Sequence, residues 1–227
     1  MLLFNFQAKI SLTFLLITDS SMVSISQFEK ARDYILQRLT HELSPRLTYH
    51  NLDHTVKEVV PAADRLADLE KVIGNSRLLL LTAAYYHDSG FIYQRDGHEN
   101  ASIQLAEQIL PSFGYAQKEI AVIRRLILAT CIPQSPTDLL EQIMADADLD
   151  YLGAANFWKR SEDLRSELEN FNTRFTDSEW YISQLHFIQE HQYFTISERT
   201  LRDATIYLHL QKIQEKLDLV HKAQKTK

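Results

Sequence analysis

The stretch Leu78-Leu79-Leu80-Leu81-Thr82-Ala83-Ala84-Tyr85-Tyr86-His87-Asp88-Ser89-Gly90 decides the fold. Up to Tyr86 it is apolar on nearly all sides of a helix, which is typical of a helix buried at the centre of a protein. His87 and Asp88, two side chains that can bind metals, follow at once. Neighbours on a helix point about 100° apart, so both can reach one ion only at a helix end or a distortion. Ser89-Gly90 is consistent with such an end.

The rest of the chain also has a helical pattern. Apolar residues recur at helical spacing, and no segment alternates convincingly with a period of two. Five glycines and five prolines in 227 residues favour long regular elements over a loop-rich β fold. We therefore predict an all-α protein. The expected helices cover residues 26–43, 51–69, 76–87, 98–111, 116–130, 137–152, 156–170, 177–192 and 197–221.

Two local signals refine this prediction. Ser26, followed by Glu29 three residues later, is the expected N-cap of the first helix in a capping-box pattern. Pro61 falls inside the second helix and should kink or split it, because proline lacks a backbone N–H and clashes with the preceding turn.

The composition excludes some classes of protein. A net charge of −6 argues against a general nucleic-acid binder, which usually has a strong basic excess. A small phosphate ester remains compatible, because a divalent metal can supply the positive charge. The single cysteine, Cys131, excludes a disulfide framework and a cysteine-rich zinc site. It lies in an apolar run, where buried cysteines are usually inert, so we do not expect a catalytic thiol.

Residues 1–21 differ from the rest. The segment from Met1 to Ile17 is mostly apolar, and its longest uncharged run, Ile10 to Thr18, is far below the roughly 20 residues that span a bilayer. It also lacks the basic start and the Ala-x-Ala site of a signal peptide. We expect residues 1–21 to be a disordered extension or a mis-assigned start preceding Met22. Residues 22–227 should then form a single cytoplasmic domain without a membrane segment.

Two further segments carry residues that suit a metal site. His54 ends the segment Tyr49-His50-Asn51-Leu52-Asp53-His54, and three acids lie in Asp146-Ala147-Asp148-Leu149-Asp150-Tyr151-Leu152-Gly153. Imidazoles and carboxylates together suit a divalent transition metal. Acids in so apolar a setting are costly to bury unless a metal, hydrogen bonds or water compensates. The joint pattern therefore predicts a metal site.

The order His54, His87-Asp88 and then aspartate resembles the signature of the HD superfamily of metal-dependent phosphohydrolases. The chain is similar to one bacterial subgroup of stand-alone HD proteins over roughly residues 47–195. This similarity includes Ile127-Leu128-Ala129-Thr130, Pro133-Gln134-Ser135-Pro136 and His191-Gln192-Tyr193-Phe194-Thr195. It implies an HD-domain helical bundle, with a motif core at about residues 47–153 and additional C-terminal helices. The exposed aromatic residues expected in those helices are compatible with a homodimer.

The resemblance implies four ligands of a divalent metal: His54, His87, Asp88 and Asp146. Asp148 is the alternative to Asp146, which we favour because it is the first acid of the run, where the family's ligand falls. Asp150, four residues after Asp146, shares its helix face and could support the ligand without touching the metal. Such a site suits Mn, Fe, Co, Ni or Zn, and suits Mg less well.

Two other histidines are candidate site residues. His50 occupies the place of the proton-donating histidine of cyclic-nucleotide phosphodiesterases, and on a continuous helix it would face the same way as His54. It is either a general acid or a water-exposed residue at a helix start. His98, followed by Glu99 as in some HD proteins, has three candidate roles: to bind a second metal, to support the first site or the substrate, or to lie on a surface loop.

The resemblance implies a metal-dependent phosphohydrolase that uses a metal-activated water, with Asp88 or Asp146 accepting its proton or orienting it. The substrate would be a nucleotide, a cyclic nucleotide or another small phosphomonoester. The alternatives are a metal-containing module that senses nucleotides or binds a partner with little turnover, and a purely structural helical protein. Cys131 departs from the family pattern, which has lysine there, so the substrate or the activity could differ. Four basic residues are candidate phosphate contacts: Lys57, Arg95, Arg124 and Arg125. The alternative for each is a solvated charge on the surface.

Overall fold

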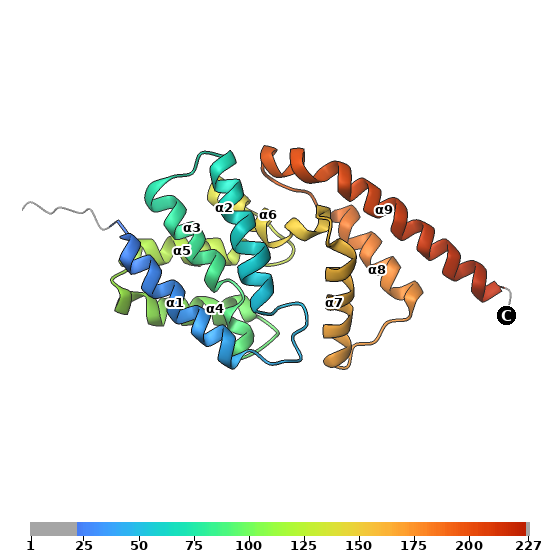
Figure 1. Ribbon diagram of the computed structural model, residues 1–227, viewed down its shortest axis with the longest axis horizontal. Coiled ribbons are helices and arrows are strands. Elements are labelled where there is room, and N and C mark those ends of the chain that lie inside the picture. The colour runs from blue at the N-terminus through green and yellow to red at the C-terminus, as the bar shows by residue number, and fades with distance from the viewer. Residues whose placement is uncertain (1–21, 226–227) are drawn as a thin grey trace, which may run out of the picture.

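The computed structural model describes residues 22–225, which are mainly helical and contain no strand (Figure 1). The prediction of an all-α fold is confirmed for this part of the chain. The predictions of a disordered extension or a mis-assigned start concern residues 1–21, which lie outside the described residues.

The helices follow the order expected from the sequence, with ends that differ by a few residues. The α-helices are α1 (Ile25–Glu42), α2 (Val60–Leu69), α3 (Gly74–Tyr86), α4 (His98–Ile109), α5 (Gln117–Leu128), α6 (Leu139–Asp148), α7 (Phe157–Asn170), α8 (Asp177–Glu190) and α9 (Ile196–Lys225). The shorter helices are the π-helix η1 (His54–Val59) and the 3₁₀ helices η2 (Ser89–Ile92), η3 (Leu110–Phe113) and η4 (Asp150–Gly153).

The N-cap of α1 is Ser24, so the prediction of Ser26 is wrong. The Ser24 hydroxyl accepts a hydrogen bond from the Gln27 amide at 3.2 Å, and the Gln27 side chain accepts one from the Ser24 amide at 2.8 Å. This capping box begins two residues before the one expected, because Gln27 serves as well as a glutamate at the third position.

Pro61 lies next to a distortion of the second helix, as predicted, but does not split it. It is in the first turn of α2, directly after η1, and the backbone on both sides is helical. The Val60 amide still donates to the Thr55 carbonyl oxygen across the wider π-turn. Wider π-turns are rare and frequently lie at functional sites, and His54 is the first residue of this one.

Two hydrophobic clusters organise the molecule. The larger one joins α1 to α6, and α3 lies within it with Leu80, Ala83, Ala84 and Tyr86 fully buried. The smaller one joins η4, α7, α8 and α9 around Leu152, Phe157 and Ile213. Figure 1 shows these two groups side by side, with α6 between them and α9 running along the edge of the second.

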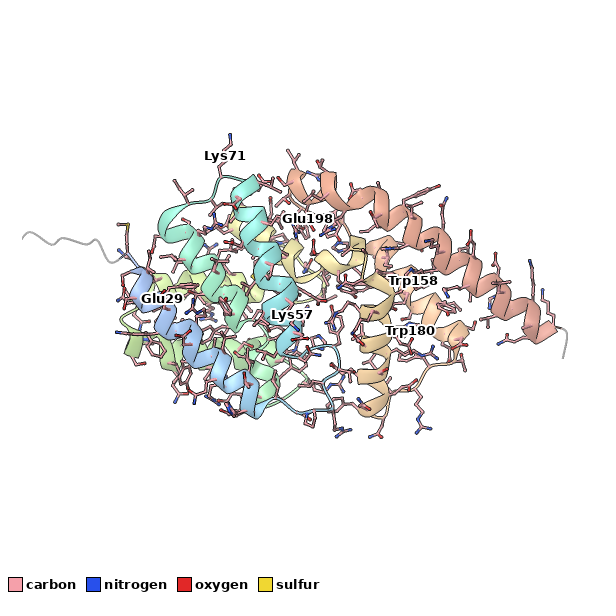
Figure 2. All side chains as sticks on the ribbon, in the orientation of Figure 1. Glu29, Lys57, Lys71, Trp158, Trp180 and Glu198 are labelled. Atoms are coloured by element: carbon pink, nitrogen blue, oxygen red, sulfur yellow. The ribbon has the colours of Figure 1, made fainter. Side chains whose placement is uncertain are left out.

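Two buried carboxyl groups and two partly exposed arginines fix the start of α9 against α2 and η4. Asp150 accepts hydrogen bonds from Arg65 Nη2 at 2.6 Å and from Arg202 Nε at 2.8 Å. Glu198, labelled near the start of α9 in Figure 2, is fully buried beside the same two arginines. Burial and the adjacent Asp150 carboxylate raise the pKa of Glu198 to about 8. Glu198 is therefore mostly protonated at neutral pH and bonds to Asp150.

We expect Glu198→Gln to become more stable relative to the parent protein as the pH rises. The pKa of Glu198 is about 8 in the folded chain against an ordinary value of 4.5, so its stabilising contribution is complete below pH 4.5 and is lost towards pH 8. Glutamine keeps the neutral, hydrogen-bonding form at every pH. The difference in the free energy of unfolding between the variant and the parent protein should grow by at most about 1.4 kcal/mol per pH unit. Thermal melts of both proteins between pH 5 and pH 9 measure it, and a constant difference would contradict the expectation.

Candidate metal centre

Donor atoms from three separate elements meet at one point. His54 begins η1, His87 follows the last residue of α3, and Asp148 ends α6; one donor atom from each lies within 4.8 Å of the other two. Asp148 Oδ1 is 3.5 Å from His54 Nε2 and 3.3 Å from His87 Nε2. Asp88 Oδ2 is 3.2 Å from His87 Nε2 and 3.8 Å from His54 Nε2.

The separations among the donor atoms of His54, His87 and Asp148 fit one divalent ion, and the 3.8 Å between Asp88 Oδ2 and His54 Nε2 is slightly longer. Donors about 2.1 Å from a common ion, at angles of about 90–120°, lie about 3.0–3.6 Å from one another. His87 Nε2 and Asp88 Oδ2 are also buried without a hydrogen-bond partner. Leaving such atoms unpaired costs about 1–3 kcal/mol each, and more for a charge. A bound metal would satisfy both atoms, so the residues fit a metal site.

The second ring nitrogen of each histidine is held in place. His87 Nδ1 is 2.9 Å from the Ala84 carbonyl oxygen, and His54 Nδ1 is 3.0 Å from Glu58 Oε2. Glu58 is held in turn by an ion pair with Arg160 at 2.9 Å. Partners of this kind fix the orientation of metal-binding imidazoles and leave Nε2 for the metal. The sequence analysis missed Glu58, although its place four residues after His54 was a signal.

The electrostatics of the cluster suit a cation. Burial alone would raise the pKa of Asp148, but the adjacent imidazoles of His54 and His87 lower it to about 2. Burial would lower the pKa of both histidines, but the neighbouring carboxylates of Asp88 and Asp148 raise it. Both acids are therefore ionised at neutral pH, and protons compete with a metal for the imidazoles.

Asp146 lies away from the histidines. Its Oδ1 accepts a hydrogen bond from the Phe194 amide at 2.8 Å, and its Oδ2 accepts from the amide and the hydroxyl of Thr195 at 2.8 and 2.7 Å. Residues two apart on a helix point about 200° apart, so only one of Asp146 and Asp148 can face the cluster. The structure brings Asp148 to it, against the register that we favoured. Asp150 is also elsewhere, paired with arginines.

His50 belongs to the site, although the helix does not extend back to it. Its ring centroid lies 6.1 Å from that of His54, and its Nδ1 is 2.6 Å from Glu167 Oε1. The backbone amides of Tyr49 and His50 donate to Glu167 Oε2 at 2.8 and 2.9 Å. Burial would raise the pKa of Glu167, but these hydrogen bonds lower it. Nothing in the sequence pointed to Glu167, which comes from α7, more than 100 residues after His50.

His98 contacts the candidate ligand Asp88. Its Nε2 is 3.4 Å from Asp88 Oδ1, and its Nδ1 is 3.0 Å from the Arg95 carbonyl oxygen. Within residues 22–225, His98 is not part of a group of three potential metal ligands, so the structure brings together no second site of that kind around it. Gly90 allows this packing, because a Cβ there would lie 1.9 Å from the His98 carbonyl oxygen.

A cavity of about 370 Å³ opens beside the cluster. Its polar end is formed by Asp88 and Asp148 together with His50 and His98. The four candidate phosphate contacts do not line it. Lys57, Arg124 and Arg125 pair with acids elsewhere, and Arg95 stacks on Phe171 at 4.2 Å.

Cys131 does not have the properties of a catalytic thiol. Burial and the neighbouring Glu99 carboxylate raise the pKa of Cys131 to about 11. A thiol with such a pKa is protonated at neutral pH and is a poor nucleophile. This agrees with the expectation of an inert cysteine.

Sequence comparison finds one distant relative. No family model matches the chain. An uncharacterized protein of Clostridium beijerinckii is 29% identical over 98 residues, which are 42% of this chain. The matched part spans 61% of the length of that curated relative, so the likeness covers less than two thirds of it.

Two crystal structures share the fold. One, a protein from Lactobacillus plantarum, is 18% identical and has a TM-score of 0.63, with 87% of this chain and all of the other covered. The second, described as a predicted HD superfamily hydrolase from an uncultured Thermotogales bacterium, is 18% identical with a TM-score of 0.55, covering 84% of this chain and 91% of the other. The expected HD-domain fold is confirmed.

Between residues 22 and 225, no helix has the length and hydrophobicity needed to cross a membrane.

Matched substitutions distinguish Asp148 from Asp146. We expect Asp148→Asn to lose most of its bound metal, because it removes a charged donor from the cluster. Asp146→Asn should keep its metal but lose about 1–3 kcal/mol of stability, since asparagine cannot accept all the hydrogen bonds at the start of α9. That loss lowers the melting temperature by roughly 2–4 °C per kcal/mol. Elemental analysis and thermal melts test both, and a folded Asp146→Asn without metal would contradict this assignment.

Proposed function

We propose that this protein is an HD-type metal-dependent phosphohydrolase that cleaves a small phosphate ester. The observation that carries the proposal is the pair of buried, unpartnered atoms His87 Nε2 and Asp88 Oδ2, which lie beside His54 and Asp148 at the end of a cavity. The proposed ligands are His54, His87, Asp88 and Asp148. The fold shared with the predicted hydrolase supports the same reading.

The ligand set defines the chemistry available. Two imidazoles and two carboxylates suit Mn, Fe, Co, Ni or Zn better than Mg. A divalent ion held by these residues would polarise a phosphate oxygen and lower the pKa of a bound water. The protein supplies the remaining functions: positioning, proton acceptance and proton donation.

His50 is the proposed general acid. Glu167 holds its Nδ1 and orients the ring, while His50 itself lines the cavity beside Asp88 and Asp148. In the overall reaction, a bond forms between phosphorus and the water oxygen, and the bond between phosphorus and the alcohol oxygen breaks. A carboxylate of Asp88 or Asp148 takes the proton of the water, and His50 gives a proton to the departing alcohol. His98 orients Asp88 through Oδ1.

We expect His87→Ala to abolish phosphate release and to lower the bound metal strongly, with folding retained. The measurement is phosphate release from a panel of phosphomonoesters and nucleotides with Mn, Mg, Co and Ni, together with elemental analysis. His41→Ala, which changes an exposed histidine on α1, is the control and should keep full activity. Unchanged turnover in His87→Ala would refute the assignment. Bound metal without turnover of any substrate would favour a sensing or partner-binding module.

The general acid can be tested through the leaving group. We expect His50→Ala to lower kcat for an alkyl phosphate by about 10²–10⁴, because an alkoxide needs a proton to depart. The loss should be much smaller for p-nitrophenyl phosphate, whose leaving group is stable as an anion. Glu167→Gln should show the same pattern more weakly, because it loosens the hold on the His50 ring. Equal losses for both substrates, with metal content unchanged, would exclude His50 as the acid.

A further inference from the structure

The cavity beside the metal cluster has an apolar end as well as a polar one. Side chains from the loop after α5, the end of α6, α7 and α8 form this end: Ile132, Leu149, Leu164, Leu168, Trp180 and Phe187. Leu164, Leu168 and Phe187 are only partly buried, so they leave apolar surface that a ligand could cover. Removing such surface from water favours binding.

Trp180 gives this end a fixed wall. It is 3% exposed, and its indole N–H donates to the Ser161 hydroxyl at 3.2 Å. Ser161 donates in turn to Gln184 Oε1 at 3.1 Å. The one polar atom of the indole is therefore satisfied within the protein, and Trp180 offers the cavity only apolar surface. Figure 2 labels Trp180 on α8 and Trp158 on the neighbouring α7.

The charge of the walls is negative. Among the described residues, no lysine or arginine lines this cavity, whereas Asp88, Glu99 and Asp148 do. The buried Arg160 is close to this region but is engaged by Glu58 and Asp163, and it stacks on the Tyr49 ring at 4.1 Å. A second or third phosphate group would therefore lie near carboxylates without a lysine or arginine to neutralise it.

We propose that the site selects phosphomonoesters whose alcohol carries an uncharged, apolar group, in preference to nucleoside diphosphates and triphosphates. This inference rests on the proposed phosphohydrolase function. The phosphate lies at the polar end with His50 and the metal ligands, and the apolar group lies against Leu168, Trp180 and Phe187. Hydrolysis breaks the bond between phosphorus and the alcohol oxygen and gives inorganic phosphate and the free alcohol.

The first experiment compares substrates with matched leaving groups. Ethyl phosphate and 2-phenylethyl phosphate release alcohols of similar acidity, so a difference in kcat/KM reports on binding rather than on departure. With the metal-loaded protein, we expect 2-phenylethyl phosphate to be at least tenfold better than ethyl phosphate, and ADP and ATP to be poorer than either. Calorimetry with 2-phenylethylphosphonate and ethylphosphonate, which are not hydrolysed, should show the same preference in Kd.

Substitutions in the wall test the cause of the preference. Phe187→Ala and Leu168→Ala should each raise KM for 2-phenylethyl phosphate about fivefold or more, with a much smaller increase for ethyl phosphate. Ile182→Ala is the matched control, because Ile182 is an exposed apolar residue of α8 that does not line the cavity. Leu168→Lys adds a cation to the wall and should improve ADP relative to 2-phenylethyl phosphate.

The outcomes separate this inference from the function on which it rests. Turnover that favours ADP, ATP or AMP over 2-phenylethyl phosphate would overturn the inference and leave the phosphohydrolase function intact. Preferential binding of 2-phenylethylphosphonate without hydrolysis of any ester would overturn the proposed function but support the ligand preference. Equal Kd values for the two phosphonates would overturn the inference directly.

Discussion

The structure depends on two buried imidazoles and two carboxylates, one buried and one partly exposed, that meet at one point inside a helical protein. Isolated charges at such a place would cost several kcal/mol each. His54, His87, Asp88 and Asp148 offset this cost by facing one another, and two of their atoms still lack a partner. The surrounding elements are arranged accordingly: α3 ends directly before His87, η1 begins at His54, and α6 ends at Asp148.

Helix α6 links the two halves of the molecule through acids on its opposite faces. Asp148 points to the histidines of the larger bundle, and Asp146 caps the start of α9. Asp150 continues this link through Arg65 and Arg202. The position of the candidate metal ligands is therefore coupled to the packing of α9, although no residue of α9 lines the cavity beside them.

The C-terminal helices complete the site in two ways. Helix α7 supplies Glu167, which holds His50 and thereby defines the proposed acid. Helices α7 and α8 also supply the apolar wall that includes Leu168 and Phe187. The larger bundle thus holds the proposed metal chemistry, while the added helices orient the proton donor and shape the space for the alcohol part of a substrate.

The sequence alone determined the all-α fold and the central place of α3, because apolar periodicity and the scarcity of glycine and proline are local properties. It also identified His54, His87 and Asp88 as a group, since their order carried the resemblance. Which of Asp146 and Asp148 faces the histidines follows only from the tertiary structure, because both acids have similar neighbours in sequence. The face of α6 that carries Asp148 meets His54 and His87, and the opposite face meets the start of α9. The tertiary structure alone revealed Glu167, whose contact with His50 joins segments more than 100 residues apart.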